Sequence, residues 1–93
     1  MSSEVLKRLP EAVLEAEINA LVHTVVRNRE NLREILNRYQ VAKPEDIKAK
    51  IVAGKLEAHP AFEDYLSAVA YRMDMEDLLK KLEEKWAELR EPL

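Results

Sequence analysis

The chain has 93 residues, a formal net charge of −3, 35% charged residues and 47% hydrophobic residues. This length suits one domain with a modest core, and the mixed, slightly acidic charge argues against a general nucleic-acid binder. The absence of cysteine excludes disulfides and cysteine-ligated zinc, and no run approaches the ~20 apolar residues that span a bilayer. We therefore expect a single cytoplasmic domain over residues 1–93, whose many Glu, Lys and Arg residues would also suit a heat-stable protein.

A long amphipathic helix is predicted over residues 11–39. Proline is tolerated in the first turn of a helix and disruptive inside one, so we expect this helix to begin near Pro10, after a short helical lead. Its apolar residues recur at spacings of four and three, which is the heptad pattern of a coiled coil. These residues are Leu14, Ile18, Leu21, Val25, Leu32, Ile35 and Tyr39.

Two polar residues, Asn28 and Arg29, interrupt the apolar stripe at its middle. Asn28 takes a seam position where an apolar residue is expected, and Arg29 points within about 20° of Ile18. Two interpretations stay open. One is a hydrogen-bonded asparagine beside an arginine whose stem lies along the seam; the other is the start of a binding or register-setting site.

A short second helix is predicted over residues 44–53. Pro44, followed by two acidic residues, has the composition of a first helical turn. Gly54, the only glycine, stands where a helix end favours a residue that tolerates a left-handed backbone. After a connector, Pro60 predicts the start of the next helix.

The last part of the chain predicts helices over residues 60–73 and 75–90. The first of these presents one apolar face, formed by Phe62, Leu66, Val69 and Met73. The apolar residues of the second lie on nearly the opposite face. The sequence leaves open whether the chain bends at Asp74 or continues as one helix whose last half packs against another surface.

These elements predict an all-α fold: a long antiparallel helical hairpin or small helical bundle with a short intervening helix, completed by dimerisation. The first helix has an apolar arc of about 180°, and the last helix reverses its apolar face. Together they present more apolar surface than one hairpin can bury. We therefore predict a protein partner or a homodimer. The predicted partner-binding residues are Leu79, Leu82, Trp86 and Leu89.

The polar gap also predicts a contact between helices. In an antiparallel hairpin, the middle of the first helix lies level with the region from Met73 to Asp77, and both places are polar. A charge on an apolar face is tolerated chiefly when it is paired, so we expect a contact there, within the chain or across a dimer. It would join Asn28 or Arg29 to one of Asp74, Glu76 and Asp77.

The sequence contains no recognisable catalytic motif, metal-ligand cluster or phosphate loop. His23 and His59 lack further ligands at a metal-binding spacing, so neither a metal nor a cofactor is expected. The alternative to a binding protein is a small all-helical enzyme that acts on an anionic small molecule. Its candidate ligands would be the first-helix arginines Arg27, Arg29 and Arg33.

The segment from Leu32 to Ala70 combines an amphipathic helix ending near a tyrosine, a short helix closed by glycine, an acidic-aromatic stretch and a charged helix. This segment resembles small helical antitoxin components of archaeal toxin–antitoxin pairs. Such proteins bind a toxin, commonly a ribonuclease, although the DNA-binding segment frequent among antitoxins is not recognisable here. We predict a non-catalytic protein-binding or assembly module, of which an antitoxin is the specific form that the resemblance implies.

Overall fold

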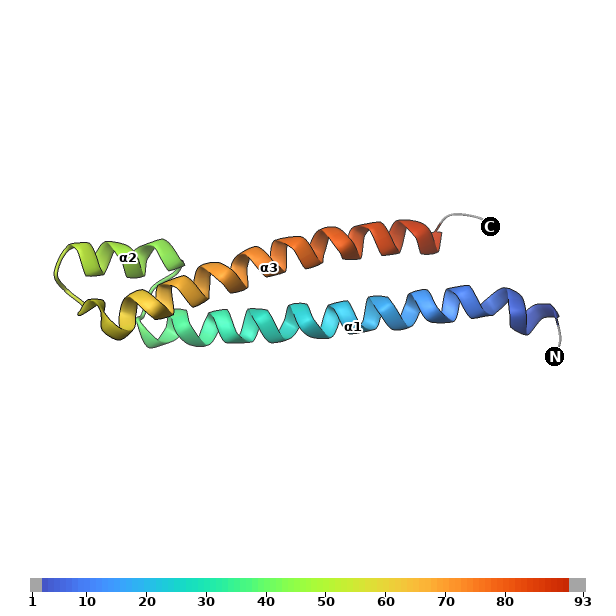
Figure 1. Cartoon of the computed structure of the whole chain (residues 1–93), viewed down its shortest axis with the longest axis horizontal. Coiled ribbons are helices and arrows are strands. Elements are labelled where there is room, and N and C mark those ends of the chain that lie inside the picture. Colours follow the sequence, from blue (N-terminus) through green and yellow to red (C-terminus); the bar gives the residue numbers. More distant parts are fainter. Residues whose placement is uncertain (1–2, 91–93) are drawn as a thin grey trace.

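The protein is a hairpin of two long helices with a short helix packed at its closed end (Figure 1). The structure, a computed structural model, describes residues 3–90. Its helices are α1 (Ser3–Arg38), α2 (Pro44–Val52) and α3 (Ala58–Arg90), and residues 3–90 contain no strand. The molecule is a rod with extents of 67 × 20 × 16 Å. The predicted all-α hairpin with a short intervening helix is confirmed.

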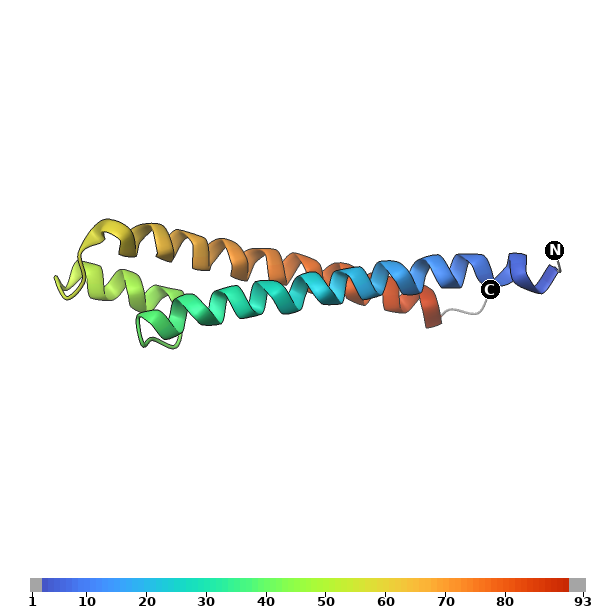
Figure 2. The same cartoon turned by 90° about the horizontal axis from the view of Figure 1, so that it is seen from below.

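The helices α1 and α2 run in the same direction, and α3 returns antiparallel to both (Figures 1 and 2). The first part of α1 extends beyond the end of α3, so nothing in the hairpin covers it. The first and last described residues lie at this open end of the rod, whereas α2 and both connections lie at the closed end.

Helix α1 begins at Ser3, so the prediction that it starts near Pro10 is wrong. Pro10 lies inside the helix and is exposed. A proline inside a helix removes one backbone hydrogen bond. At an exposed position, water can reach the carbonyl group that loses its partner, and the helix continues.

A residue with a left-handed backbone lies two positions after the end of α1 and of α2. Gly54 has φ 74°, as predicted, and Gln40 has φ 53°, which the sequence did not indicate. After each, the next backbone N–H donates to the carbonyl five residues earlier, at 3.0 Å for Val41 and 2.9 Å for Lys55. These bonds form Schellman motifs, which satisfy carbonyl groups left free at a helix end.

The two left-handed residues predict stability changes of opposite sign. Gly54→Ala should lower the free energy of unfolding by about 1 kcal/mol, because alanine is strained at positive φ although space is available for its Cβ. Gln40→Gly should raise it by about 0.5 kcal/mol, since strain is relieved at some cost in unfolded-chain entropy. Urea unfolding followed by circular dichroism at one protein concentration measures both. Destabilisation by Gln40→Gly would contradict the strain argument.

The hydrophobic core lies at the closed end, where all three helices meet. Its buried residues are Ile35 from α1, Ile47 from α2, and Ala61 and Ala68 from α3. Ile47 is 0% exposed and is the largest fully buried side chain in the described part of the chain. Ile47 is thus the fully buried contact between α2 and the hairpin, and the half-buried Ile51 packs beside it.

Helix α3 is continuous through Asp74, which settles the alternative between a break and one helix. The backbone of His59 is extended (φ −109°, ψ 121°), so regular helix starts at Pro60 as predicted. Its inward positions recur every seven residues, at Ala61, Ala68, Met75, Leu82 and Leu89, and each is buried or half-buried. An unbroken heptad seam needs no bend.

The predicted inward face of the first half of α3 is wrong. Phe62, Leu66 and Met73 are 46%, 51% and 58% exposed and Val69 is half-buried, whereas Ala61 and Ala68 are buried. Small side chains let helix backbones approach closely, so the alanines occupy the place where α3 meets its neighbours. The larger apolar residues are turned outward.

Candidate functional site

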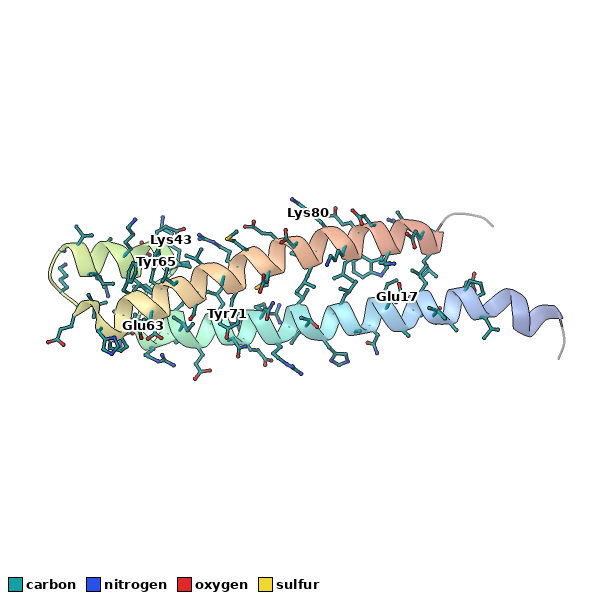
Figure 3. The ribbon with its side chains drawn as sticks, in the orientation of Figure 1. Glu17, Lys43, Glu63, Tyr65, Tyr71 and Lys80 are labelled. Atoms are coloured by element: carbon teal, nitrogen blue, oxygen red, sulfur yellow. The ribbon has the colours of Figure 1, made fainter. Side chains whose placement is uncertain are left out.

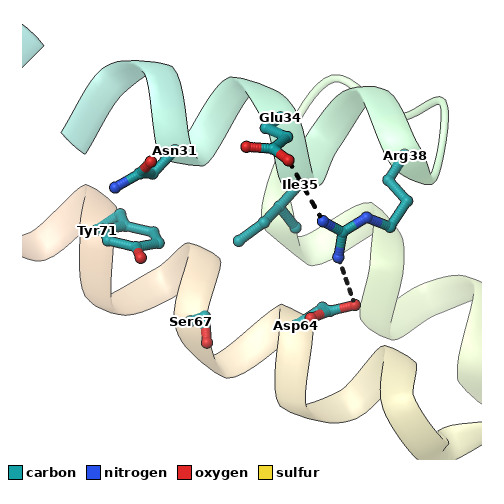
Figure 4. A pocket seen from close by; sticks show the side chains of 7 residues that line it. All are labelled: Asn31, Glu34, Ile35, Arg38, Asp64, Ser67 and Tyr71. Atoms are coloured by element: carbon teal, nitrogen blue, oxygen red, sulfur yellow. Dashed lines mark hydrogen bonds and ion pairs between the residues drawn. The ribbon is translucent and has the colours of Figure 1, made fainter. Parts of the chain in front are cut away.

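A polar hollow lies between α1 and α3 near the closed end (Figure 4). Its volume is about 230 Å³, and its lining residues are Asn31, Glu34, Ile35, Arg38, Asp64, Ser67 and Tyr71. Pockets that enclose a small-molecule ligand usually have volumes of about 300–1,000 Å³. The hollow is therefore small for a metabolite. What it could do chemically is decided by the charged side chains that line it.

The carboxylate of Asp64 is the centre of the hollow's hydrogen bonds. Arg38 donates from Nη1 to Asp64 Oδ2 at 3.2 Å, and the Tyr39 hydroxyl donates to the same oxygen. A second nitrogen of Arg38 lies 3.8 Å from Glu34 Oε1. These contacts join the end of α1 to the start of α3. Their role is structural, because they hold the two helices together.

The groups around Asp64 do not form an activated nucleophile or base. Burial, together with the hydrogen bond to Asp64, raises the pKa of the Tyr39 phenol above its ordinary value of 10.0. A phenol with a raised pKa stays protonated at neutral pH and acts as a donor. Ser67 lines the hollow without a histidine among the other lining residues, so the arrangement lacks the base that activates a serine.

Helix α2 is fastened to α3 by an ion pair that sequence reasoning missed. Arg72 donates from both terminal nitrogens to the two carboxylate oxygens of Glu45, with Nη1 to Oε2 at 2.9 Å. Planar two-point pairing of this kind is geometrically specific. The hydrogen bond from Arg72, with a backbone hydrogen bond at Glu45 itself, lowers the pKa of Glu45 to about 2.

The Glu45–Arg72 pair predicts a pH dependence of stability. The folded-state pKa of Glu45, about 2, lies below the ordinary value of 4.5, so its contribution is complete above pH 4.5 and disappears as the pH falls towards 2. The difference in unfolding temperature between the wild type and Glu45→Gln should therefore be constant above about pH 5 and shrink below pH 4.5. Calorimetry at a series of pH values tests this, with exposed Glu57→Gln as the charge-matched control.

A second, larger hollow lies along the same two helices towards the open end, with a volume of about 410 Å³. Lys85 Nζ lies 2.8 Å from Glu17 Oε2 at its rim, and this hydrogen bond raises the pKa of Lys85. Figure 3 shows Glu17 on α1 opposite the last part of α3. The remaining lining residues are Ala20, Leu21, Thr24 and Lys81. The ion pair shows that Glu17 of α1 and Lys85 of α3 lie at the same level of the hairpin.

The contact predicted for the polar gap does not form within the chain. Arg29 is exposed, and no ion pair or hydrogen bond between described side chains joins it or Asn28 to Asp74, Glu76 or Asp77. The three carboxylates are themselves exposed. Solvent satisfies these groups, so no internal pairing is required. A pairing of Arg29 across a dimer stays a prediction.

The predicted partner-binding residues separate into two groups. Leu82 is 3% exposed, so it belongs to the seam between α1 and α3 and is not available to a partner. Leu89 is half-buried, whereas Leu79 and Trp86 are 47% and 44% exposed. Only the latter two present large apolar side chains on the surface of the last half of α3.

No group of three or more histidine, cysteine, aspartate or glutamate side chains within the described residues could hold a metal ion. His59 Nδ1 lies 2.9 Å from Glu63 Oε1, on an exposed surface. None of the three helices, as far as the structure describes them, is long and apolar enough to cross a membrane.

No curated protein and no solved structure matches the chain. A family model does match it, over residues 1–88, and this range includes all of α1 and α2 and nearly all of α3. The chain therefore belongs to the uncharacterized protein MJ0235 family.

Proposed function

We propose that the chain is a non-catalytic protein-binding or assembly module. The observation that carries this proposal is the number of large apolar side chains that the rod leaves exposed along α3. These are Phe62, Leu66, Met73, Leu79 and Trp86. Phe62, Leu66 and Met73 lie on one side of α3, and Leu79 and Trp86 lie on another, about 130° away on an ideal helix. Clusters of exposed aromatic and aliphatic groups are typical of docking faces.

The size of the accessible surface supports the same proposal. The chain exposes 7105 Å² for a mass of 10.8 kDa. A compact monomer of this mass would expose about 5,500 Å². The rod therefore carries roughly 1,500 Å² of additional surface, more than the ~800 Å² that each partner buries in a standard protein–protein interface.

The enzyme alternative finds less support. Arg27 points about 160° away from Arg29 on an ideal helix, so the first-helix arginines do not converge on one ligand. All three are exposed, and the polar hollow contains a carboxylate already engaged by Arg38 and Tyr39. An antitoxin role is a narrower form of the binding proposal and rests on the sequence resemblance alone.

Purification of the full chain from its native host, followed by native mass spectrometry, tests the proposal. A stoichiometric protein partner or a homo-oligomer without a small ligand is the expected result. A monomer that carries a small anion would contradict it and favour the enzyme.

The binding face predicts a large effect of Trp86→Ala on assembly. Truncation of a large aromatic side chain that an interface buries commonly weakens binding by a factor of ten or more. We expect the dissociation constant of the assembly, measured by analytical ultracentrifugation, to rise by about tenfold. Val52→Ala, on a side chain that is 80% exposed on α2, should leave it unchanged. An unaltered assembly after loss of Trp86 would move the binding face elsewhere.

A further inference from the structure

One surface stripe of α1 has a charge pattern that its packing within the chain does not use. On an ideal helix its six residues lie within an arc of about 60°. Along the chain they are two acids, two valines and two arginines: Glu11, Glu15, Val22, Val26, Arg29 and Arg33. We call this set the α1 stripe. All four charged members are exposed, and no ion pair between described side chains involves them.

The α1 stripe is symmetric about Val22. Glu11 and Arg33 lie equally far from Val22 in the sequence, on opposite sides, and so do Glu15 and Arg29. A second α1 crossing antiparallel at Val22 would place each acid opposite an arginine. A parallel copy in the same register would place acid against acid and arginine against arginine. The pattern therefore fits an antiparallel copy of the same helix.

The hairpin has two flanks, and α2 covers part of one of them, at the closed end. The α1 stripe lies on that flank. The Glu17–Lys85 pair and its hollow mark the other flank, because Glu17 and Val22 point about 140° apart on α1. On α3, Arg72 faces α2 through Glu45, and Leu79 and Trp86 follow on nearly the same side of that helix. Beyond α2, this flank presents valines from α1 and large apolar groups from α3.

The levels of the two helices agree with one shared binding face. Residues 17–24 of α1 and residues 81–85 of α3 line the same hollow, so Val22 lies close to the level of Leu79 and Trp86. The α1 stripe from Glu11 to Arg33 is about 33 Å long at 1.5 Å per residue. A helix laid along it would thus cover about half of the 67 Å rod, and the α3 side chains would border it.

We propose that a second copy of this chain binds through the α1 stripe, with the two α1 helices antiparallel and the twofold axis at Val22. Glu11 pairs with the partner's Arg33, and Glu15 pairs with the partner's Arg29, so one crossing forms four ion pairs around a valine centre. Arg29 interrupts the apolar face and has no carboxylate partner among the described side chains of its own chain, and it obtains one from the copy. This inference rests on the proposed assembly function and names the partner and the surface.

Charge reversal tests the register directly. Glu11→Arg with Glu15→Arg gives a stripe with only positive charges, and Arg29→Glu with Arg33→Glu gives one with only negative charges. Each double variant should self-associate roughly 100-fold more weakly than the wild type, because like charges would face each other. An equimolar mixture of the two should form a heterodimer close to wild-type affinity, and the quadruple variant should again form a homodimer. Analytical ultracentrifugation measures all four cases.

Matched controls keep the charge changes comparable. Glu30→Arg and Arg27→Glu reverse single charges on the same helix, each by half the charge change of a double variant, at exposed positions outside the α1 stripe, and should leave association unchanged. Circular dichroism confirms that each variant is helical. Higher salt should weaken the wild-type dimer and strengthen self-association of both double variants, since it screens attraction and repulsion alike.

A single cysteine reports the position of the twofold axis, because the chain has no native cysteine. Under mild oxidation Val22→Cys should form a disulfide-linked dimer rapidly, since the two copies of this position meet at the axis. His23→Cys, next along the chain and turned about 100° away, should cross-link much more slowly.

The outcomes separate this inference from the function on which it rests. A monomeric wild type at 100 μM, no heterodimer in the mixture, or equal cross-linking at both positions would overturn the register. A dimer that ignores the α1 stripe charges but weakens with Trp86→Ala would also overturn it, while leaving the assembly function in place. Absence of both self-association and any stoichiometric protein partner would contradict the proposed function itself.

Discussion

Replacing Ile47 with alanine is expected to lower the free energy of unfolding by about 3 kcal/mol. Ile47 is 0% exposed and is the buried apolar residue through which α2 joins the core. Removal of three buried carbon atoms loses their transfer free energy and leaves a cavity that rigid helices close only in part. For a small domain this is a large fraction of the total stability.

The matched control for Ile47 lies on the same helix. Val52→Ala removes apolar atoms from a side chain that is 80% exposed, so its effect should stay within about 0.5 kcal/mol. Urea unfolding at one fixed protein concentration compares the two variants, because any self-association makes apparent stability depend on concentration. Similar effects of the two substitutions would mean that α2 is not held by Ile47.

Leu82→Ala is expected to cost a similar amount, roughly 2–4 kcal/mol, and to act on the other half of the rod. Leu82 is 3% exposed and Ile18 is 9% exposed, and they are the buried apolar residues of the hairpin outside the closed-end core. With the leucine truncated, the open half would lose most of its apolar seam. Amide hydrogen exchange should therefore accelerate in the last turns of α3 more than near Ala68.

The control for Leu82 is an exposed leucine on the same helix, away from the proposed dimer face. Leu66→Ala, at a position 51% exposed, should change stability by less than about 1 kcal/mol and leave the exchange pattern unaltered. Uniform acceleration of exchange along the whole chain in Leu82→Ala would show that the two halves unfold as one unit.

The arrangement of helices followed from local signals in the sequence. The heptad spacing of α1 predicted its length towards Arg38, and Pro44, Gly54 and Pro60 marked the limits of α2 and the start of regular α3. These residues act through their own backbone preferences, which do not depend on tertiary contacts. Pro10 misled because its cost depends on whether water reaches the backbone there, which only the tertiary structure decides.

The face of α3 was mispredicted because alanine was not counted as a core residue. Ala61 and Ala68 continue the seven-residue spacing of Met75, Leu82 and Leu89, so the seam was present in the sequence. Alanine buries little area and has a weak apolar signal, whereas Phe62 and Leu66 have a strong one. A search for heptads that includes alanine would have found one continuous helix.

The ionic contacts of the site could not be predicted from the sequence. Glu45 and Arg72 lie 27 residues apart, and their pairing depends on how α2 is placed along α3. The same holds for Arg38 with Asp64 and for Glu17 with Lys85. Many charged residues were available as partners, and each pair is selected by a helix register that buried apolar side chains set.

The position of the chain ends determines how the rod would respond to a pulling force. The first and last described residues both lie towards the open end, whereas the three-helix core lies at the other end. A force that pulls these ends apart would act across the hairpin and peel α3 from α1 one turn at a time, as in the opening of a zipper. The Glu17–Lys85 pair would separate early, and the contacts around Ile47 would resist last.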